Sequence, residues 1–299
     1  MRVLITGATG YIGSAIVSEL IAAGHQVTGL ARSDASSEAL IAAGAAVARG
    51  SLDDLAALRA GAASADGVIH AAFTNVSPTT DFATACQADA AAISALGAGL
   101  EGTGKPLVIT SGTGLVGVPG RAATEEDLAN WGPRVAGEEA ALALAGRGVR
   151  VSIARLSLSV HDGQADHNGF IPALIALARQ KGTSAYIGDG ANRWTGVHRL
   201  DAARLFRLAL ESAPAGARLH GVGDEGVPFR QIAEAIGAGL GLPVTAVAAE
   251  GAGAHFGYLA PFAGLDNPSS NERTKALLDW KPEHPGLLTD IEHGGYLTA

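Results

Sequence analysis

The chain has 299 residues, 47% of them hydrophobic and 17% charged, which is enough for a large buried core and excludes a disordered chain. Its net charge of −8, from 21 basic and 29 acidic residues, leaves no phosphate-neutralising surface and excludes nucleic acid as an expected partner. The single cysteine, Cys86, excludes an internal disulfide and fits a reducing compartment, so we expect a cytoplasmic protein.

Short apolar segments alternate with longer amphipathic ones through the first half of the chain. The N-terminal segment 1–5 reaches a glycine turn too early for a signal peptide, and no apolar run approaches the roughly 18 residues of a membrane span, so we expect no membrane association. The predicted strands are 2–6, 26–31, 46–50, 67–71, 106–111 and 149–155. The predicted helices are 11–23, 36–43, 53–60, 80–100 and 134–146. Because the strands lack polar alternation, they predict a parallel sheet with helices on both faces, which is a Rossmann-type doubly wound α/β fold.

A glycine-rich turn joins the first strand to the first helix. It reads Gly7-Ala8-Thr9-Gly10-Tyr11-Ile12-Gly13, and a dinucleotide site requires this strand-turn-helix context. One glycine permits the tight turn, another lets a phosphate approach the backbone, and the third lets helix and strand pack closely. The N–H groups at the helix start would bind the pyrophosphate. The predicted cofactor contacts here are Gly7, Thr9, Gly10, Tyr11, Ile12 and Gly13.

The end of the second strand indicates which dinucleotide is bound. An NAD site usually has an acidic residue there, which accepts hydrogen bonds from the ribose, but this chain has Arg32 and Ser33 and no acid before Asp34. A guanidinium can pair with a 2′-phosphate, and the serine can donate a further hydrogen bond. We therefore expect NADP(H) to be preferred, with NAD(H) as the alternative. The competing interpretation is that Arg32 is a solvated loop cation.

Residues after the third and fourth strands are expected in the same groove. Ser51 and Leu52 follow the third strand, where the adenine would lie. Ala71, Ala72 and Phe73 follow the fourth strand, beside the expected pyrophosphate and ribose. These five residues complete the predicted cofactor contacts of the first half.

After about residue 160 the loops become longer and richer in glycine. The predicted helices there are 169–180, 200–211, 228–240 and 269–278, and the predicted strands are 184–187, 194–198, 218–221 and 244–247. We interpret 1–160 as a dinucleotide-binding Rossmann domain and 161–299 as a smaller C-terminal substrate-binding lobe, interleaved with the first domain and not independent of it.

Several motifs together resemble those of the extended short-chain dehydrogenase/reductase superfamily, in particular its NAD-dependent epimerase/dehydratase family. The motifs are Thr6–Gly13, Asp66–Ala72, Leu107–Gly112, Gly188–Gly190, Arg193–Trp194, Val197–Asp201 and Leu278–Pro282. The likeness covers nearly the whole chain. It implies a nicotinamide-dependent oxidoreductase and, through the helices 80–100 and 134–146, a homodimer.

The resemblance also implies a Tyr-x-x-x-Lys catalytic pair, and this chain departs from it. The matching positions hold Asn130 and Arg134. An amide does not exchange a proton near neutral pH and a guanidinium stays charged, so neither can be the general acid. Arg134 could still hold the nicotinamide ribose and stabilise negative charge on a substrate oxygen, unless it is a solvated first-turn arginine. In this respect the chain resembles the atypical members of the superfamily.

The family's catalytic Ser or Thr position corresponds to Gly112, which Ser111 and Thr113 flank. Either hydroxyl could orient a carbonyl group, or it could bond its own backbone. The resemblance further implies substrate contacts downstream, where a histidine is the natural proton donor. The expected substrate-binding residues are Phe73, Trp131, His161, His167, Arg193, Trp194 and His198. The first of these and the two tryptophans would make the pocket apolar if they converge.

The leading hypothesis is an NADPH-dependent reductase acting on a small, mostly apolar carbonyl compound. Arg134 with Ser111 or Thr113 would hold the developing oxyanion, and water or a histidine would deliver the proton. One alternative is a nucleotide-sugar epimerase or dehydratase, in which Arg193 would bind a phosphate as the matching arginine does in sugar epimerases. Another alternative is a non-catalytic NADP-binding redox sensor.

Overall fold

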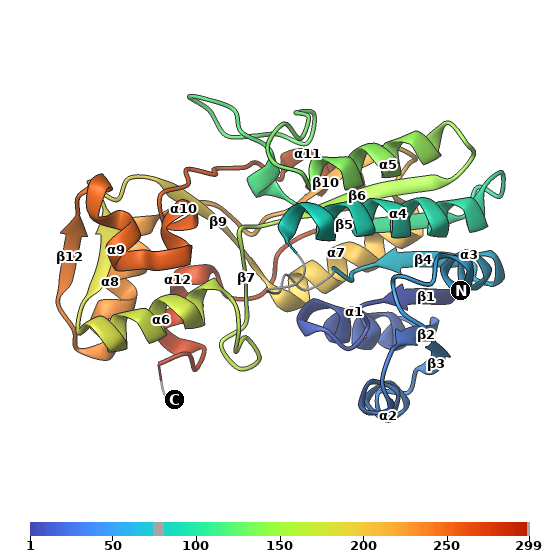
Figure 1. Ribbon diagram of the computed structural model, residues 1–299, viewed down its shortest axis with the longest axis horizontal. Coiled ribbons are helices and arrows are strands. Elements are labelled where there is room, and N and C mark those ends of the chain that lie inside the picture. The colour runs from blue at the N-terminus through green and yellow to red at the C-terminus, as the bar shows by residue number, and fades with distance from the viewer. Residues whose placement is uncertain (74–80, 298–299) are drawn as a thin grey trace.

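Seven parallel strands form the central sheet of the protein in a computed structural model, which describes residues 1–73 and 81–297 (Figure 1). The strands are β1 (Arg2–Thr6), β2 (Gln26–Ala31), β3 (Ala46–Arg49), β4 (Gly67–His70), β5 (Pro106–Gly112), β6 (Arg150–Leu156) and β10 (Ala217–Gly221). Their order across the sheet is β10-β6-β5-β4-β1-β2-β3, so the direction of winding reverses between β1 and β4. In a doubly wound sheet, the crevice at this reversal is where a nucleotide binds.

Helices cover both faces of the sheet. One face carries α1 (Tyr11–Ala22), α2 (Asp34–Ala42) and α7 (Arg199–Ser212), and the other carries α3 (Leu55–Ser64), α4 (Phe82–Leu100) and α5 (Val135–Ala145). Side chains that alternate along each strand supply the two cores: Ile5 and Ile69 pack on the α1 side, and Leu4 and Val68 on the α4 side. The predicted fold class is therefore confirmed.

A smaller lobe lies beyond the carboxyl ends of the strands (Figure 1). It contains a three-stranded sheet of β7 (Ser159–His161), β9 (Arg193–His198) and β11 (Asp224–Pro228), and the pair β8 (Ser184–Ile187) with β12 (Val244–Val247). Its helices are α6 (Phe170–Lys181), α8 (Phe229–Leu240), α9 (Ala252–Phe256), α10 (Ala260–Ala263) and α12 (Leu287–His293). Trp194 and Phe229 are buried at the centre of this lobe, with ring centroids 4.9 Å apart.

Two elements that the sequence assigns to the smaller lobe belong to the large sheet and its helix layer. The strand at 217–221 pairs in parallel with β6, and the helix before it, α7, packs its apolar stripe against α1. Periodicity identifies such elements but does not say which sheet they join. The later helix α11 (Glu272–Leu278) also packs against β10 and α7.

The predicted helix 80–100 begins at Phe82 among the described residues, and residue 80 lies outside them. No helix in the described ranges has the length and apolar character needed to cross a bilayer.

Candidate functional site

The glycine turn between β1 and α1 lies at the crevice where the sheet order reverses. Gly7 has a φ of +71°, and the N–H of Gly10 donates to its carbonyl at 2.9 Å. A Cβ atom on Gly13 would lie 1.9 Å from the Gly7 carbonyl oxygen, so helix and turn approach more closely than any side chain permits. Since no side chain caps α1, its first N–H groups are left to bind an anion such as a diphosphate.

A groove of about 460 Å³ runs along the carboxyl ends of the strands from this turn. It contains most of the cofactor contacts predicted from the sequence. The described residues that line it are Gly7, Thr9, Gly10, Leu30, Arg32, Ser36, Gly50, Ser51, Leu52, Asp53, Ala71, Ala72 and Phe73. Ile12 and Gly13 instead pack beneath the turn, Ile12 against the core on the α1 side. The groove thus has the extent and the backbone donors that a dinucleotide requires.

One end of the groove is polar and carries an unpaired cation. The exposed Arg32 guanidinium makes no hydrogen bond or ion pair with any residue that the structure describes. The expected second donor, Ser33, is the N-cap of α2: its hydroxyl accepts from the N–H of Ser36 at 3.2 Å and donates to the Ser36 hydroxyl at 3.0 Å. Because the Ser36 oxygen accepts that bond, its own proton is free to enter the groove. The sequence predicts this helix to begin at residue 36, whereas it begins at Asp34, so the sequence did not indicate that the Ser36 side chain lines the groove.

Phe73 lines the other end of the groove, and Arg134, which is not itself among the lining residues, packs against the Phe73 ring. The guanidinium carbon lies 4.4 Å from the centroid of the Phe73 ring, and Nη2 reaches the carbonyl oxygen of Thr110 at 3.5 Å. The Nε atom of Arg134 is buried and has no partner among the described residues. A buried donor without an acceptor is costly, so this atom fits a polar group supplied by a bound molecule, such as a ribose hydroxyl.

The two hydroxyls expected to hold a substrate oxygen are both engaged inside the protein. Ser111 donates to Oε1 of Glu138 at 2.6 Å, and Glu138 forms a buried ion pair with Arg155 at 2.7 Å. Thr113 donates to Oδ1 of Asn267 at 2.8 Å and is fully buried. Neither residue lines the groove. Both hydroxyls therefore donate their protons to other side chains of the protein and have no free O–H group directed at a substrate.

Asn130 and Trp131 belong to the exposed segment before α5. The Asn130 amide closes a loop, because it accepts from the N–H of Gly117 at 3.1 Å and donates to the same residue's carbonyl at 3.0 Å. Trp131 is 59% exposed. In this structure neither side chain lines the groove, although the sequence placed both at the active site.

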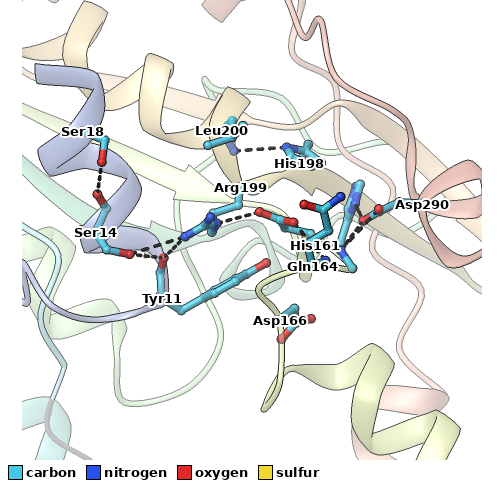
Figure 2. Close-up of polar contacts among 12 residues, drawn as sticks. Tyr11, Ser14, Ser18, His161, Gln164, Asp166, His198, Arg199, Leu200 and Asp290 are labelled. Atoms are coloured by element: carbon cyan, nitrogen blue, oxygen red, sulfur yellow. Dashed lines mark hydrogen bonds and ion pairs between the residues drawn. The ribbon is translucent and has the colours of Figure 1, made fainter. Parts of the chain in front are cut away.

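A second pocket, of about 700 Å³, shares Thr9 and Gly10 with the groove and lies between α1 and the segment that follows β6. Figure 2 shows Arg199, the first residue of α7, reaching Tyr11 and Ser14. Its Nε lies 2.9 Å from Oδ2 of Asp162, and its Nη1 lies 3.2 Å from the Tyr11 carbonyl oxygen. The pair between Arg199 and Asp162 therefore joins the smaller lobe to the cofactor turn.

The ionisable groups of this pocket are strongly influenced by burial. Burial, reinforced by the nearby Asp166 carboxylate, raises the pKa of the Tyr11 hydroxyl well above its usual range, and that hydroxyl has no partner among the described residues. Burial also raises the pKa of Asp166, whose carboxylate accepts from the N–H of Gly169 at 2.8 Å and from the hydroxyl of Tyr296 at 2.9 Å. Asp166 thus fastens the loop that leads into α6.

The three predicted histidines have different environments. His161 is buried, and its Nδ1 lies 2.7 Å from Oδ2 of Asp290. His198 caps α7 by accepting from the N–H of Leu200 at 3.2 Å, and burial lowers its pKa. His167 is exposed and lines the second pocket. Only His167 of the three is thus open to a molecule in that pocket.

Arg193 and Trp194, also expected at the substrate site, are held by their own lobe. The Arg193 guanidinium forms a two-pronged pair with Asp266 at 3.0 and 2.8 Å. The Trp194 ring is 1% exposed and donates to the carbonyl of Phe262 at 2.9 Å. Of the expected substrate residues, Phe73 and His167 line the two cavities that meet at the glycine turn.

Comparison with known proteins agrees with this geometry. A family model described as the NAD dependent epimerase/dehydratase family matches residues 3–220. An uncharacterised protein of Schizosaccharomyces pombe is 46% identical over 298 residues, covering 99% of this chain and 100% of that protein. An uncharacterised protein of Saccharomyces cerevisiae is 43% identical over 296 residues, covering 97% of this chain and 98% of that protein. The structure of a dTDP-glucose 4,6-dehydratase from Streptomyces venezuelae, with NAD and TYD bound, matches with a TM-score of 0.78 at 20% identity, over 99% of this chain and 96% of that one.

Proposed function

Since the chain belongs to the NAD dependent epimerase/dehydratase family, we propose that it is an NADPH-dependent reductase of a small, uncharged and mostly apolar carbonyl compound. The observation that carries this proposal is the groove itself, which has an anion-binding glycine turn at its centre and the unpaired cation Arg32 at its polar end. When bound, NADPH would supply a hydride from C4 of its nicotinamide ring.

Arg32 and Ser36 would bind the 2′-phosphate that distinguishes NADPH from NADH. The guanidinium has no competing partner among the described residues, and the Ser36 hydroxyl has a proton left to donate. The nearest other cation at this edge, Arg49, is already paired with Asp34 at 2.8 Å. Charge-assisted contacts to a phosphate therefore fall to Arg32.

Arg134 would act at the opposite end of the groove. Its unpartnered Nε fits a ribose hydroxyl, and its fixed positive charge beside Phe73 would stabilise the negative charge that develops on a carbonyl oxygen. This role requires a stationary charge and no proton transfer, so a guanidinium can fill it although it cannot act as an acid.

The ion pairs of Arg199, which lines the second pocket, and of Arg193 in the smaller lobe favour an uncharged substrate. Arg199 is paired with Asp162, and Arg193 is paired with Asp266, so neither guanidinium is free to bind a diphosphate. Phe73 and Phe170 add apolar walls to the two cavities. A neutral carbonyl compound satisfies these groups better than a nucleotide sugar does.

A second candidate function is that of a nucleotide-sugar epimerase or dehydratase. It is favoured by the match, over nearly the whole chain, to a dTDP-glucose 4,6-dehydratase. Such an enzyme would retain NAD and bind a nucleoside diphosphate, whereas the proposed reductase would exchange NADPH and ignore the diphosphate.

One experiment separates the two candidates. The purified protein is titrated with NADPH and NADH, followed by fluorescence, and is then incubated with NADPH and a panel of neutral aldehydes and ketones. Saturable binding that favours NADPH, together with substrate-dependent loss of absorbance at about 340 nm, is expected. Tightly retained NAD together with saturable binding of UDP or dTDP would favour the second candidate and refute the first.

A further inference from the structure

The described residues around the nicotinamide end of the groove offer few sources for the proton that a carbonyl reduction needs. Asn130 and Arg134 are not acids near neutral pH. The protons of Ser111 and Thr113 are donated to Glu138 and Asn267 inside the protein. The hydroxyls of Thr9 and Ser14 beside the glycine turn are aliphatic alcohols, which are not acids near neutral pH, and the raised pKa of the Tyr11 phenol makes it a poorer proton donor than an ordinary tyrosine.

The order of the strands places the second pocket on the opposite side of the end of β5 from Phe73. Strands β4 and β6 flank β5, and the residues that follow them, Phe73 and Leu158, line the groove and the second pocket respectively. The two cavities share Thr9 and Gly10. A carbonyl compound bound beyond the end of β5 therefore lies between Arg134 with Phe73 on one side and the second pocket on the other.

Among the titratable side chains that line the second pocket, His167 differs from the rest. The Tyr11 hydroxyl is buried, Asp166 accepts hydrogen bonds from Gly169 and Tyr296, and Arg199 is paired with Asp162. The imidazole of His167 is exposed, and within the described part of the chain it has no hydrogen bond, ion pair or ring contact. It can therefore turn toward a substrate and exchange its proton with solvent.

We propose that His167 is the general acid of the reduction, taking the place of the absent tyrosine. This inference rests on the proposed reductase function. As a hydride from the cofactor adds to the carbonyl carbon, the C=O π pair moves to oxygen, and an imidazolium N–H of His167 gives its proton to that oxygen. The products are an alcohol, NADP⁺ and neutral His167, which takes up a proton from water before the next turnover. Arg134 holds the oxygen while the proton moves.

Two features suit this side chain to the task. Histidine is the side chain that most often serves as a general acid or base in enzymes. The loop that carries it is anchored on both sides, because Asp166 bonds to Gly169 and Tyr296 and α6 begins at Phe170. A fixed backbone with a free side chain allows proton delivery without rearrangement of the lobe.

The test compares the wild type with His167→Ala and with the control His293→Ala, whose side chain is 77% exposed on α12 and does not line the second pocket. The measurements are kcat with NADPH and a reducible carbonyl compound between about pH 5.5 and 9, NADPH affinity, and the effect of added imidazole. We expect His167→Ala to lower kcat by about 10²–10⁴-fold with unchanged NADPH affinity, and imidazole to restore much of the rate. The wild-type rate should fall toward alkaline pH, where a general acid loses its proton, and the control should behave like the wild type.

The outcome decides between this inference and the function on which it rests. If the wild type turns over and the rate of His167→Ala is within threefold of it, only the proposed role of His167 is overturned. The same holds if His167→Ala loses more activity and imidazole does not restore it. Absence of turnover by the wild type with the whole carbonyl panel overturns the reductase proposal and the role of His167 together.

Discussion

Replacing Arg32 by alanine removes the one cation at the adenosine end of the groove that has no partner among the described residues. A hydrogen bond to a charged group contributes about 1.5–3 kcal/mol, and the exposure of Arg32 to solvent and salt places its contribution toward the lower end. About 1.5–2 kcal/mol corresponds to NADPH binding roughly 10–30-fold more weakly. NADH has no 2′-phosphate, so its affinity should change by less than about threefold.

The assay is a fluorescence titration of each variant with NADPH and NADH at two salt concentrations. Arg49→Ala is the matched control, because it removes the same charge from the end of the neighbouring strand, where the guanidinium is paired with Asp34 and donates to Ser37 at 2.7 Å. The NADPH affinity of the wild type should weaken with salt more steeply than that of Arg32→Ala. Equal losses for NADPH and NADH in Arg32→Ala would refute the reasoning, and so would an Arg49→Ala variant with the same selective loss.

Three further predictions test the rest of the site. Arg134→Met keeps the packing against Phe73 but removes the charge, so steady-state kinetics should show kcat reduced by about 10–100-fold, and an unchanged kcat would exclude Arg134 from catalysis. Arg155→Met leaves the buried Glu138 carboxylate without its counter-charge, so urea unfolding should show that the free energy of unfolding decreases by about 3–5 kcal/mol. Much of this stability should be recovered when Glu138→Leu is added. A decrease of under about 1 kcal/mol would contradict the prediction. Folding lowers the pKa of His198 below its unfolded value of 6.5, so the free energy of unfolding has its full value above that pH and decreases as the pH drops through 6.5 toward the folded pKa. His198→Asn keeps an acceptor for the N–H of Leu200 that does not titrate, so the urea midpoint of this variant should fall less than that of the wild type between pH 7.5 and 5.5. An equal fall in the two proteins would exclude His198 as a source of acid sensitivity.

Local patterns were enough to predict strands both in the central sheet and in the smaller lobe. The strands at 26–31, 184–187 and 244–247 have the bounds expected from their apolar runs. The short β7 and β11 have no such signal, because three residues do not define a period and β11 contains Asp224, Gly226 and Pro228. Their strand geometry depends on pairing with β9, which is a contact between distant parts of the chain.

The cofactor-binding part of the candidate site depends on local sequence, whereas the environments of the expected substrate-side residues depend on contacts between distant parts of the chain. The glycine turn and Arg32 act through residues close to them in sequence, so a motif was sufficient to predict them. The environment of Thr113 depends on Asn267, which is 154 positions away, and that of His161 depends on Asp290, which is 129 positions away. No spacing rule within one segment can tell a free side chain from one that is already bonded in this way.

The separation between these halves also explains how the chain can lack the tyrosine and keep a complete cofactor groove. Binding of the proposed dinucleotide would depend on backbone donors of the turn and on Arg32, and among the described residues none of these forms a hydrogen bond with the segment that holds Asn130. Proton delivery would need only one titratable side chain near the substrate, and the loop before α6 lines the pocket that shares Thr9 and Gly10 with the groove. The donor can therefore move from one loop to another without disturbing the groove, provided that a fixed charge remains to hold the substrate oxygen. In the proposed mechanism Arg134, which packs on the Phe73 ring, would supply that charge, and the cofactor and the proton donor would then act on the same carbonyl group.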